Sequence, residues 1–296
     1  MRILIAAFAL VAPLGAAPFE FENGDRVLLL GNTFFEREGN YGHLEARLAA
    51  GLAEKDLTFR NMGWSGDTVD CHARSYFGPP KEGFDRLRTN LGLVKPTVVI
   101  ACYGSNAAFA GEPGRAAFIE GYQRLLSMIK ETTGARIVLV SPPPCETLGA
   151  PLPDMTEQNE RLSRYRDAIK GLAAREGYAF VDLFAKLGDG AAGEEELTDN
   201  GVHFTDSGYS AIAPGFAELF GIASDRLASE DYERMRDLIV EKNRLFFNRW
   251  RPQNETYLRG FRKHEQGQNA RELAEFAPLI EEKDKEIQEL AKKLSQ

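Results

Sequence analysis

The sequence has few cysteines, few histidines and no excess of basic residues. Its three cysteines show no CxxC or CxxCH spacing, and no pair of histidine and carboxylate side chains has metal-ligand spacing, so neither a metal nor another cofactor is expected. The formal charge of −8 and the pI of about 5.3 argue against a nucleic-acid partner. The 296 residues suffice for the core of one large domain with some excess.

The chain begins with a short apolar stretch that is too short to span a bilayer as a permanent helix. Met1 and Arg2 precede the largely apolar residues 3–14, and small residues follow at 15–17. This order is typical of a signal peptide, with a buried first strand or helix as the alternative. We therefore expect a signal peptide over 1–17, a periplasmic or secreted location, and no membrane span after processing.

Short apolar runs alternate with amphipathic helices along the next two hundred residues. This pattern predicts an α/β fold in three layers, α/β/α, with a parallel sheet covered on both faces. A last helix is expected to begin near Asp206, with Asp206 or Thr205 as its N-cap. The expected strands cover residues 26–31, 57–62, 97–103, 136–141 and 178–183.

The composition changes near residue 229. We expect a domain over 18–228 and a C-terminal helical extension over 229–296 that packs on it, because its aromatic residues would otherwise leave an exposed apolar patch. Within it, residues 250–268 form an aromatic and basic arm. A platform for sugars or acidic ligands is one interpretation of this arm, and packing across the domain is the favoured one. The extension is also expected to allow association with other exported proteins.

Four polar blocks stand where ligands bind in such a sheet, at the carboxyl ends of the strands. They are residues 31–33 (GNT), 61–68 (NMGWSGDT), 104–106 (GSN) and 197–203 (LTDNGVH). Taken together, these blocks resemble the SGNH, or GDSL-type, hydrolases, which are esterases, lipases and carbohydrate deacetylases. The resemblance covers about residues 24–222 and implies a flavodoxin-like sheet and ester hydrolysis.

The resemblance also implies roles for individual residues. Gly66 and Asn106 match the glycine and asparagine of the oxyanion hole, which donate hydrogen bonds to the negative oxygen that develops during acyl transfer. His203 matches the general base, and Thr33 stands where the family has its nucleophilic serine. Each residue also has a structural alternative: Gly66 as a turn glycine, Asn106 as a loop cap, and His203 as a surface or core histidine whose hydrogen bonds are satisfied by its surroundings.

Three positions depart from the family pattern. Thr33 replaces the serine and carries a methyl group beside the attacking oxygen. Asn32 replaces the preceding aspartate, and Asn200 replaces the aspartate that orients His203. An amide can hold an imidazole in place but cannot stabilise its positive charge. Asp199 is one residue too early, although an adjusted loop would bring its carboxylate to the ring.

The predicted function is ester hydrolysis on a small acyl or O-acetylated carbohydrate substrate. Ser65 and Ser105 lie in the same loops and are alternative nucleophiles, with turn-stabilising hydroxyls as the favoured interpretation. The rival prediction is a catalytically silent carbohydrate-binding or assembly protein that retains the pocket. The GNT block and the WRPQN sequence of the arm also resemble an SGNH-like subgroup that often occurs joined to c-type haem modules.

Overall fold

The computed structural model describes residues 19–188, 195–223, 229–266 and 269–295, so the expected signal peptide lies outside the described residues. Its centre is a parallel sheet with the strand order β2-β1-β3-β4-β5. The strands are β1 (Arg26–Gly31), β2 (Thr58–Asn61), β3 (Val98–Cys102), β4 (Arg136–Val140) and β5 (Ala179–Val181). All five expected strands are present: β1 has the expected bounds, and the other four are shorter, with β5 reduced to three residues. The predicted α/β class is confirmed.

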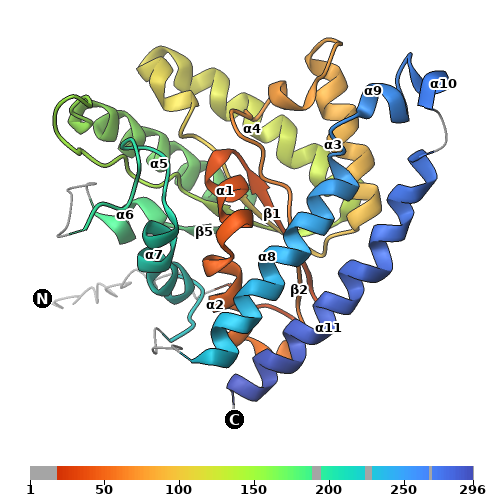
Figure 1. The fold of residues 1–296 in the computed structure, drawn as a ribbon. Helices are drawn as coiled ribbons and strands as arrows, with labels where there is room; N and C mark the ends of the chain where they lie inside the picture. Colours follow the sequence, from red (N-terminus) through yellow and green to blue (C-terminus); the bar gives the residue numbers. More distant parts are fainter. Residues whose placement is uncertain (1–18, 189–194, 224–228, 267–268, 296) are drawn as a thin grey trace, which may run out of the picture.

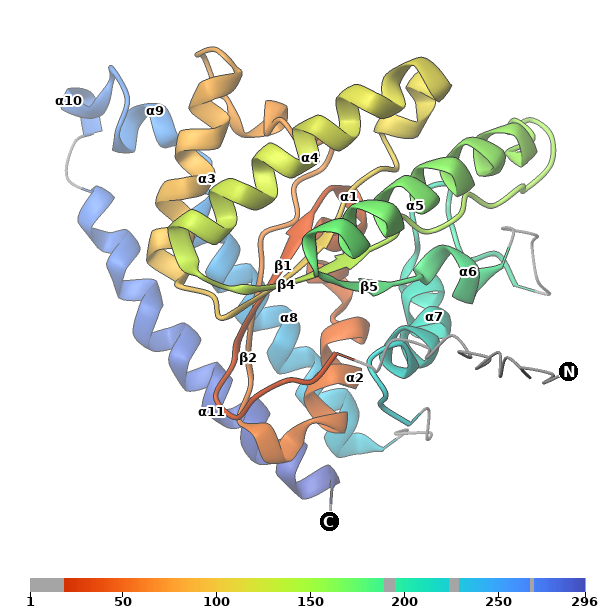
Figure 2. The same ribbon diagram turned by 180° about the vertical axis from the view of Figure 1, so that it is seen from behind.

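Helices cover both faces of the sheet. The face in front in Figure 2 carries α3 (Pro80–Val94), α4 (Gly111–Thr133) and α5 (Thr156–Glu176). The face in front in Figure 1 carries α1 (Thr33–Tyr41), α2 (His43–Gly51), α7 (Asp206–Glu218) and α8 (Glu230–Trp250). Leu28 and Leu30 of β1 pack into the first layer, and Val27 and Leu29 into the second. Burial on both faces explains why the strands read as continuous apolar runs.

Shorter helical segments connect these elements. They are η1 (Ala53–Lys55), η2 (His72–Arg74), η3 (Ala107–Ala110), α6 (Leu183–Leu187), α9 (Glu255–Leu258), α10 (Lys263–Gln266) and η4 (Asn269–Glu275). Helix α7 begins as expected, because Thr205 is its N-cap and accepts a hydrogen bond from the backbone N–H of Gly208. No helix in the described ranges is long and apolar enough to cross a membrane.

The register of the sheet brings the carboxyl ends of three strands together. Gly31 at the end of β1 pairs with Cys102 at the end of β3, and Leu29 pairs with Asn61 at the end of β2. The backbone N–H of Trp64 continues this pairing by donating to the carbonyl of Gly31 at 3.0 Å. The polar segments after β1, β2 and β3 therefore start at the same edge of the sheet.

The C-terminal extension lies against the sheet layer and not apart from it. Helix α8 contacts α1, α2 and the edge strand β2, and α11 (Phe276–Leu294) runs beside α8, as Figure 1 shows. Arg60 of β2 forms an ion pair with Asp284 of α11, with donor–acceptor distances down to 2.5 Å. Two long helices of the extension thus cover β2.

The start of the arm packs against the loop that follows β2. The Trp250 ring lies 5.6 Å from the Trp64 ring between centroids, and the Arg251 guanidinium lies 3.7 Å from the centroid of Trp64. Farther along the arm, Phe261 is exposed. Among the aromatic contacts of the described residues, its ring has one partner, the ring of Phe77, which is also exposed. Packing therefore accounts for Trp250 and Arg251, which lie at the base of the arm.

Candidate functional site

Thr33 is the first residue of α1 and lies directly after the end of β1. Asn32 is the N-cap, and its side-chain oxygen accepts a hydrogen bond from the backbone N–H of Phe34 at 3.3 Å. The hydroxyl oxygen of Thr33 accepts a long hydrogen bond from the backbone N–H of Gly66, at 3.4 Å. The loop after β2 therefore places one N–H group directly beside the predicted nucleophile.

The conformation of that loop depends on Gly66 and on the buried residue that follows it. Gly66 has a φ of 74°, in the left-handed region that favours glycine. The carboxylate of Asp67 is buried and accepts hydrogen bonds from Arg74 at 2.7 Å and from the Tyr103 hydroxyl at 3.1 Å. Burial raises the pKa of Tyr103 well above its ordinary value, so its hydroxyl stays a donor. These contacts fix the position of the Gly66 N–H.

Asn106 reaches the same loop from the end of β3. Its side-chain amide donates to the backbone carbonyl of Asp67 at 3.4 Å. The Asn106 amide, one predicted oxyanion donor, is thus held at the residue that follows Gly66, whose backbone N–H is the other. The structure brings Thr33, Gly66 and Asn106 together.

The loop that carries His203 is held beside the start of α1. Thr198 and Phe204 form an isolated antiparallel bridge that closes this loop, and the ring of Phe204 packs against Phe34 with 5.7 Å between centroids. Arg37 of α1 forms an ion pair with Asp199 at 2.8 Å. The described residues show no hydrogen bond between Thr33 and His203. The loop and the nucleophile turn are therefore neighbours, without a hydrogen bond between these two side chains.

Of the two candidates for orienting His203, only Asn200 touches the ring. The distance between Asn200 Nδ2 and His203 Nδ1 is 2.9 Å. The carboxylate of Asp199 instead faces Arg37 of α1, and the backbone N–H of Asp199 donates to the carbonyl of His203 at 3.0 Å. The adjusted loop that would bring Asp199 to the imidazole is not the arrangement found.

Glu146 is a supporting residue that sequence reasoning missed. Its buried carboxylate accepts hydrogen bonds from the backbone N–H groups of Leu197 at 3.0 Å and Thr198 at 2.8 Å, and from the Thr198 hydroxyl at 2.6 Å. These bonds anchor the first residues of the His203 loop. A lone glutamate after a predicted strand gave no signal of this role, because its partners lie about fifty residues later.

Glu36 is a second missed residue, and it connects the site to the extension. Its carboxylate accepts a hydrogen bond from the backbone N–H of Ser65 at 2.6 Å and forms an ion pair with Arg251. The backbone of the loop next to Gly66 is therefore held by a residue of α1, which is held in turn by the arm.

The two alternative nucleophiles are not activated. Neither Ser65 nor Ser105 makes a side-chain hydrogen bond with a histidine in the described ranges, so neither has a general base beside it.

Two cavities lie near these residues. A cavity of about 180 Å³ opens at the ends of β1 and β3, and its lining includes Asn32, Asn106 and Phe118. A second cavity, of about 400 Å³, lies between α1 and α8, and its lining includes Arg37 and Arg244. The predicted oxyanion asparagine thus lines a small pocket, and the extension helps to form a larger one that Ser65, the residue before Gly66, also lines.

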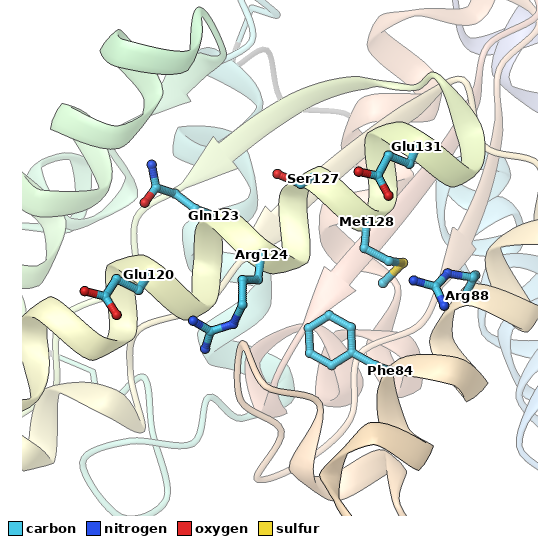
Figure 3. A pocket seen from close by; sticks show the side chains of 8 residues that line it. All are labelled: Phe84, Arg88, Glu120, Gln123, Arg124, Ser127, Met128 and Glu131. Atoms are coloured by element: carbon cyan, nitrogen blue, oxygen red, sulfur yellow. The ribbon is translucent and has the colours of Figure 1, made fainter.

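A third hollow lies away from the strand ends. It is an open groove of about 560 Å³ between α3 and α4, where Met128 of α4 points toward Phe84 and Arg88 of α3 (Figure 3). None of the predicted site residues lines it. The groove therefore has no part in the chemistry proposed for the strand ends.

The cysteines are not placed for catalysis or metal binding. Cys71, Cys102 and Cys145 are buried and free, and burial raises the pKa of Cys71 to about 12 and that of Cys145 to about 11. Such thiols are not nucleophilic near neutral pH, because the thiolate is the reactive form. Within the part of the chain that the structure describes, no group of three or more His, Cys, Asp or Glu side chains is placed to hold a metal ion.

The chain is similar to known proteins of one family. A model of the GDSL-like lipase/acylhydrolase family matches residues 29–211, whereas no curated protein matches the chain. A catalytic mutant of an acetylxylan esterase from Geobacillus stearothermophilus is similar in structure, with a TM-score of 0.52 and 19% identity over 70% of this chain and 99% of that one.

A gut microbial diltiazem-metabolizing enzyme has a TM-score of 0.54 and 20% identity over 68% of this chain. The match covers 48% of that enzyme, so this chain spans about half of its length. At such identities the likenesses establish the shared fold, and the family model establishes membership. The chain belongs to the GDSL-like lipase/acylhydrolase family.

Proposed function

We propose that the protein is an esterase that removes a small acyl group, with O-acetylated carbohydrates as the substrate class. The observation that carries this proposal is the 3.4 Å contact between the Thr33 hydroxyl and the Gly66 N–H, beside Asn106 at the strand ends. A nucleophile that lies beside oxyanion donors is what acyl transfer requires. Membership of a family of lipases and acylhydrolases supports the same reaction class.

The reaction proceeds through an acyl-enzyme. The Thr33 oxygen attacks the ester carbonyl carbon, and the carbonyl electron pair moves onto the oxygen. The Thr33 proton passes to Nε2 of His203, which accepts it when the ring carries its own proton on Nδ1. The Gly66 N–H and the Asn106 amide donate to that oxyanion, and one such donor is typically worth about 10²–10³ in kcat. When the carbonyl re-forms, the alcohol leaves with the proton from His203. Water then attacks the acyl-threonine by the same steps and releases the acid.

The small cavity suits a short acyl group. A cavity of about 150 Å³ is large enough to take up benzene, so about 180 Å³ accommodates an acyl chain of a few carbons. Its lining combines the apolar Val69, Ala107 and Phe118 with polar side chains that include Asn106, Asp70 and His72. This combination fits a carbonyl group with a short apolar tail.

The larger cavity between α1 and α8 suits the alcohol part of the ester. Arg37, Asn243 and Arg244 provide polar groups there, and Phe247 provides an aromatic surface. Polar groups beside an aromatic ring are suited to a sugar, which has hydroxyl groups and an apolar ring face. This composition supports a carbohydrate ester over a purely apolar one.

The direct test is hydrolysis of aryl acetate and release of acetate from acetylated xylo-oligosaccharides by the full chain. Activity should fall with acyl length from acetate to octanoate, and His203→Ala should abolish it. Activity that equals that of His203→Ala on every ester would contradict the proposal.

We also propose that the protein is exported, because residues 1–17 have the pattern of a signal peptide. Mass spectrometry of exported material should find an N-terminus near residues 17–19.

One observation favours the binding-protein alternative, in which the pocket retains a carbohydrate without cleaving it. The imidazole of His203 faces an amide and not a carboxylate. A binding protein would retain acetylated oligosaccharides without releasing acetate, also after Thr33→Ser.

A further inference from the structure

The side chain of Asn200 has only one possible orientation. Its Oδ1 accepts hydrogen bonds from the backbone N–H of Val202 at 3.1 Å and from that of His203 at 2.9 Å. Backbone N–H groups only donate, so the atom that faces them must be the carbonyl oxygen of the amide. The usual ambiguity between oxygen and nitrogen in an asparagine side chain is therefore removed.

The orientation of Asn200 determines which nitrogen of His203 carries the proton. The NH₂ group of Asn200 lies 2.9 Å from His203 Nδ1. An amide NH₂ only donates, so Nδ1 must accept and be unprotonated. A neutral imidazole has one proton, which then resides on Nε2.

We propose that Asn200 is a positioning residue that holds His203 in the Nε2–H tautomer and thereby keeps ester hydrolysis slow. The effect on rate rests on the proposed function, whereas the tautomer does not. A base that takes the Thr33 proton at Nε2 needs a free electron pair there and its own proton on Nδ1. Asn200 favours the opposite arrangement, with the proton on Nε2 and the electron pair on Nδ1. In the charged ring, which carries a proton on both nitrogens, the NH₂ group of Asn200 would face the N–H group at Nδ1.

The neighbouring carboxylate of the loop is not placed to reverse this preference. The carboxylate of Asp199 is ion-paired with Arg37 at 2.8 Å. The bridge between Thr198 and Phe204 and the bond from the Asp199 N–H to the His203 carbonyl hold the backbone of the loop. In a serine-protease triad the comparable aspartate-to-asparagine change lowers kcat by about 10⁴ through the wrong tautomer.

The tautomer is directly measurable by nitrogen-15 NMR of the imidazole groups in the full chain. The His203 signals are assigned by their absence from the spectrum of His203→Ala. In the neutral ring, we expect His203 to be protonated on Nε2. A ring protonated on Nδ1 would overturn the proposal without the need for any further variant.

The variant Asn200→Asp changes the atom that faces the ring and little else. One carboxylate oxygen still accepts from the N–H groups of Val202 and His203, and the other accepts from Nδ1, so the ring should switch to the Nδ1–H tautomer. Asp199→Asn is the matched control, because it alters the neighbouring side chain that does not touch the ring. It should leave the tautomer of His203 unchanged.

The rate should follow the tautomer. We expect Asn200→Asp to raise kcat for aryl acetate by about 10²–10⁴-fold, and His203→Ala should remove the gain. An unchanged tautomer in Asn200→Asp would overturn the proposal. If Asn200→Asp switches the tautomer but neither it nor the double variant Asn200→Asp/Thr33→Ser hydrolyses esters, the tautomer assigned to His203 would be supported and the esterase function refuted.

Discussion

The ammonium group of Lys242 in α8 forms an ion pair with the carboxylate of Glu45 in α2, and both side chains are buried. Lys242 also donates to the backbone carbonyl of Phe59 in β2 at 3.1 Å, and the Asn243 amide donates to Glu45 at 3.2 Å. The extension and the sheet layer therefore share charged groups that are satisfied only when α8 is in place. Removal of one partner leaves the other as an uncompensated charge in the interior.

Lys242→Met should lower the free energy of unfolding by about 3–5 kcal/mol, because it leaves the Glu45 carboxylate buried without its cation. Urea denaturation of the full chain measures this difference. The double variant Lys242→Met/Glu45→Leu should recover part of the loss, since an apolar pair carries no desolvation cost. Lys293→Met, which removes the exposed partner of Asp231, is the matched control and should have little effect.

The stability of the protein should depend on pH through Glu38. Burial raises the pKa of Glu38 well above its ordinary value of 4.5, although the N–H groups of Leu44 and Glu45 donate to it. The folded state therefore holds this proton more tightly than the unfolded state. The contribution of Glu38 is fully present below pH 4.5 and is lost as the pH rises toward the folded-state pKa.

Glu38→Gln removes this titration and keeps an oxygen for the two N–H groups. Its free energy of unfolding relative to the parent should therefore rise between pH 4 and pH 8. Denaturation at several pH values measures the difference. A constant difference across this range would show that Glu38 keeps its ordinary pKa in the folded protein.

Thr33→Ser should raise esterase activity on small aryl esters. The substitution removes the methyl group that restricts the side-chain rotamer beside the attacking oxygen and keeps the hydroxyl that faces Gly66. We expect an increase in kcat of about tenfold, which corresponds to about 1.4 kcal/mol of transition-state free energy. Thr33→Val keeps the shape without the hydroxyl and should be inactive, and equal rates for all three proteins would argue against a role for position 33.

Asn106→Ala should lower kcat by about 10²–10³ with little change in KM, because it removes a donor that acts mainly on the transition-state oxyanion. Steady-state kinetics on aryl acetate, preferably in the more active Thr33→Ser background, measure both constants. Thermal unfolding serves as the control, since among the described residues the Asn106 side chain makes one hydrogen bond, a long one to the carbonyl of Asp67. A loss confined to KM would assign Asn106 to substrate binding.

The sequence by itself determined the sheet and the place of the site. Strands buried on both faces must be apolar along their whole length, so residues 26–31 and 97–103 were recognisable as strands without any partner. Parallel strands end at one edge, so the polar blocks around Thr33, Gly66 and Asn106 were expected to meet there. Family membership followed from the order of these blocks.

Only the tertiary structure decided which side chains act on one another. In the sequence, Asn200 stands at the family position and Asp199 one residue before it, and either could orient His203. The ion pair with Arg37, 162 positions away, assigns the carboxylate of Asp199 to α1 and leaves the amide of Asn200 to His203. The partners of Lys242 and Glu146 likewise depend on how distant segments pack. Local patterns report burial and backbone conformation, whereas hydrogen-bond partners far apart in the chain are fixed only when the elements that carry them are docked.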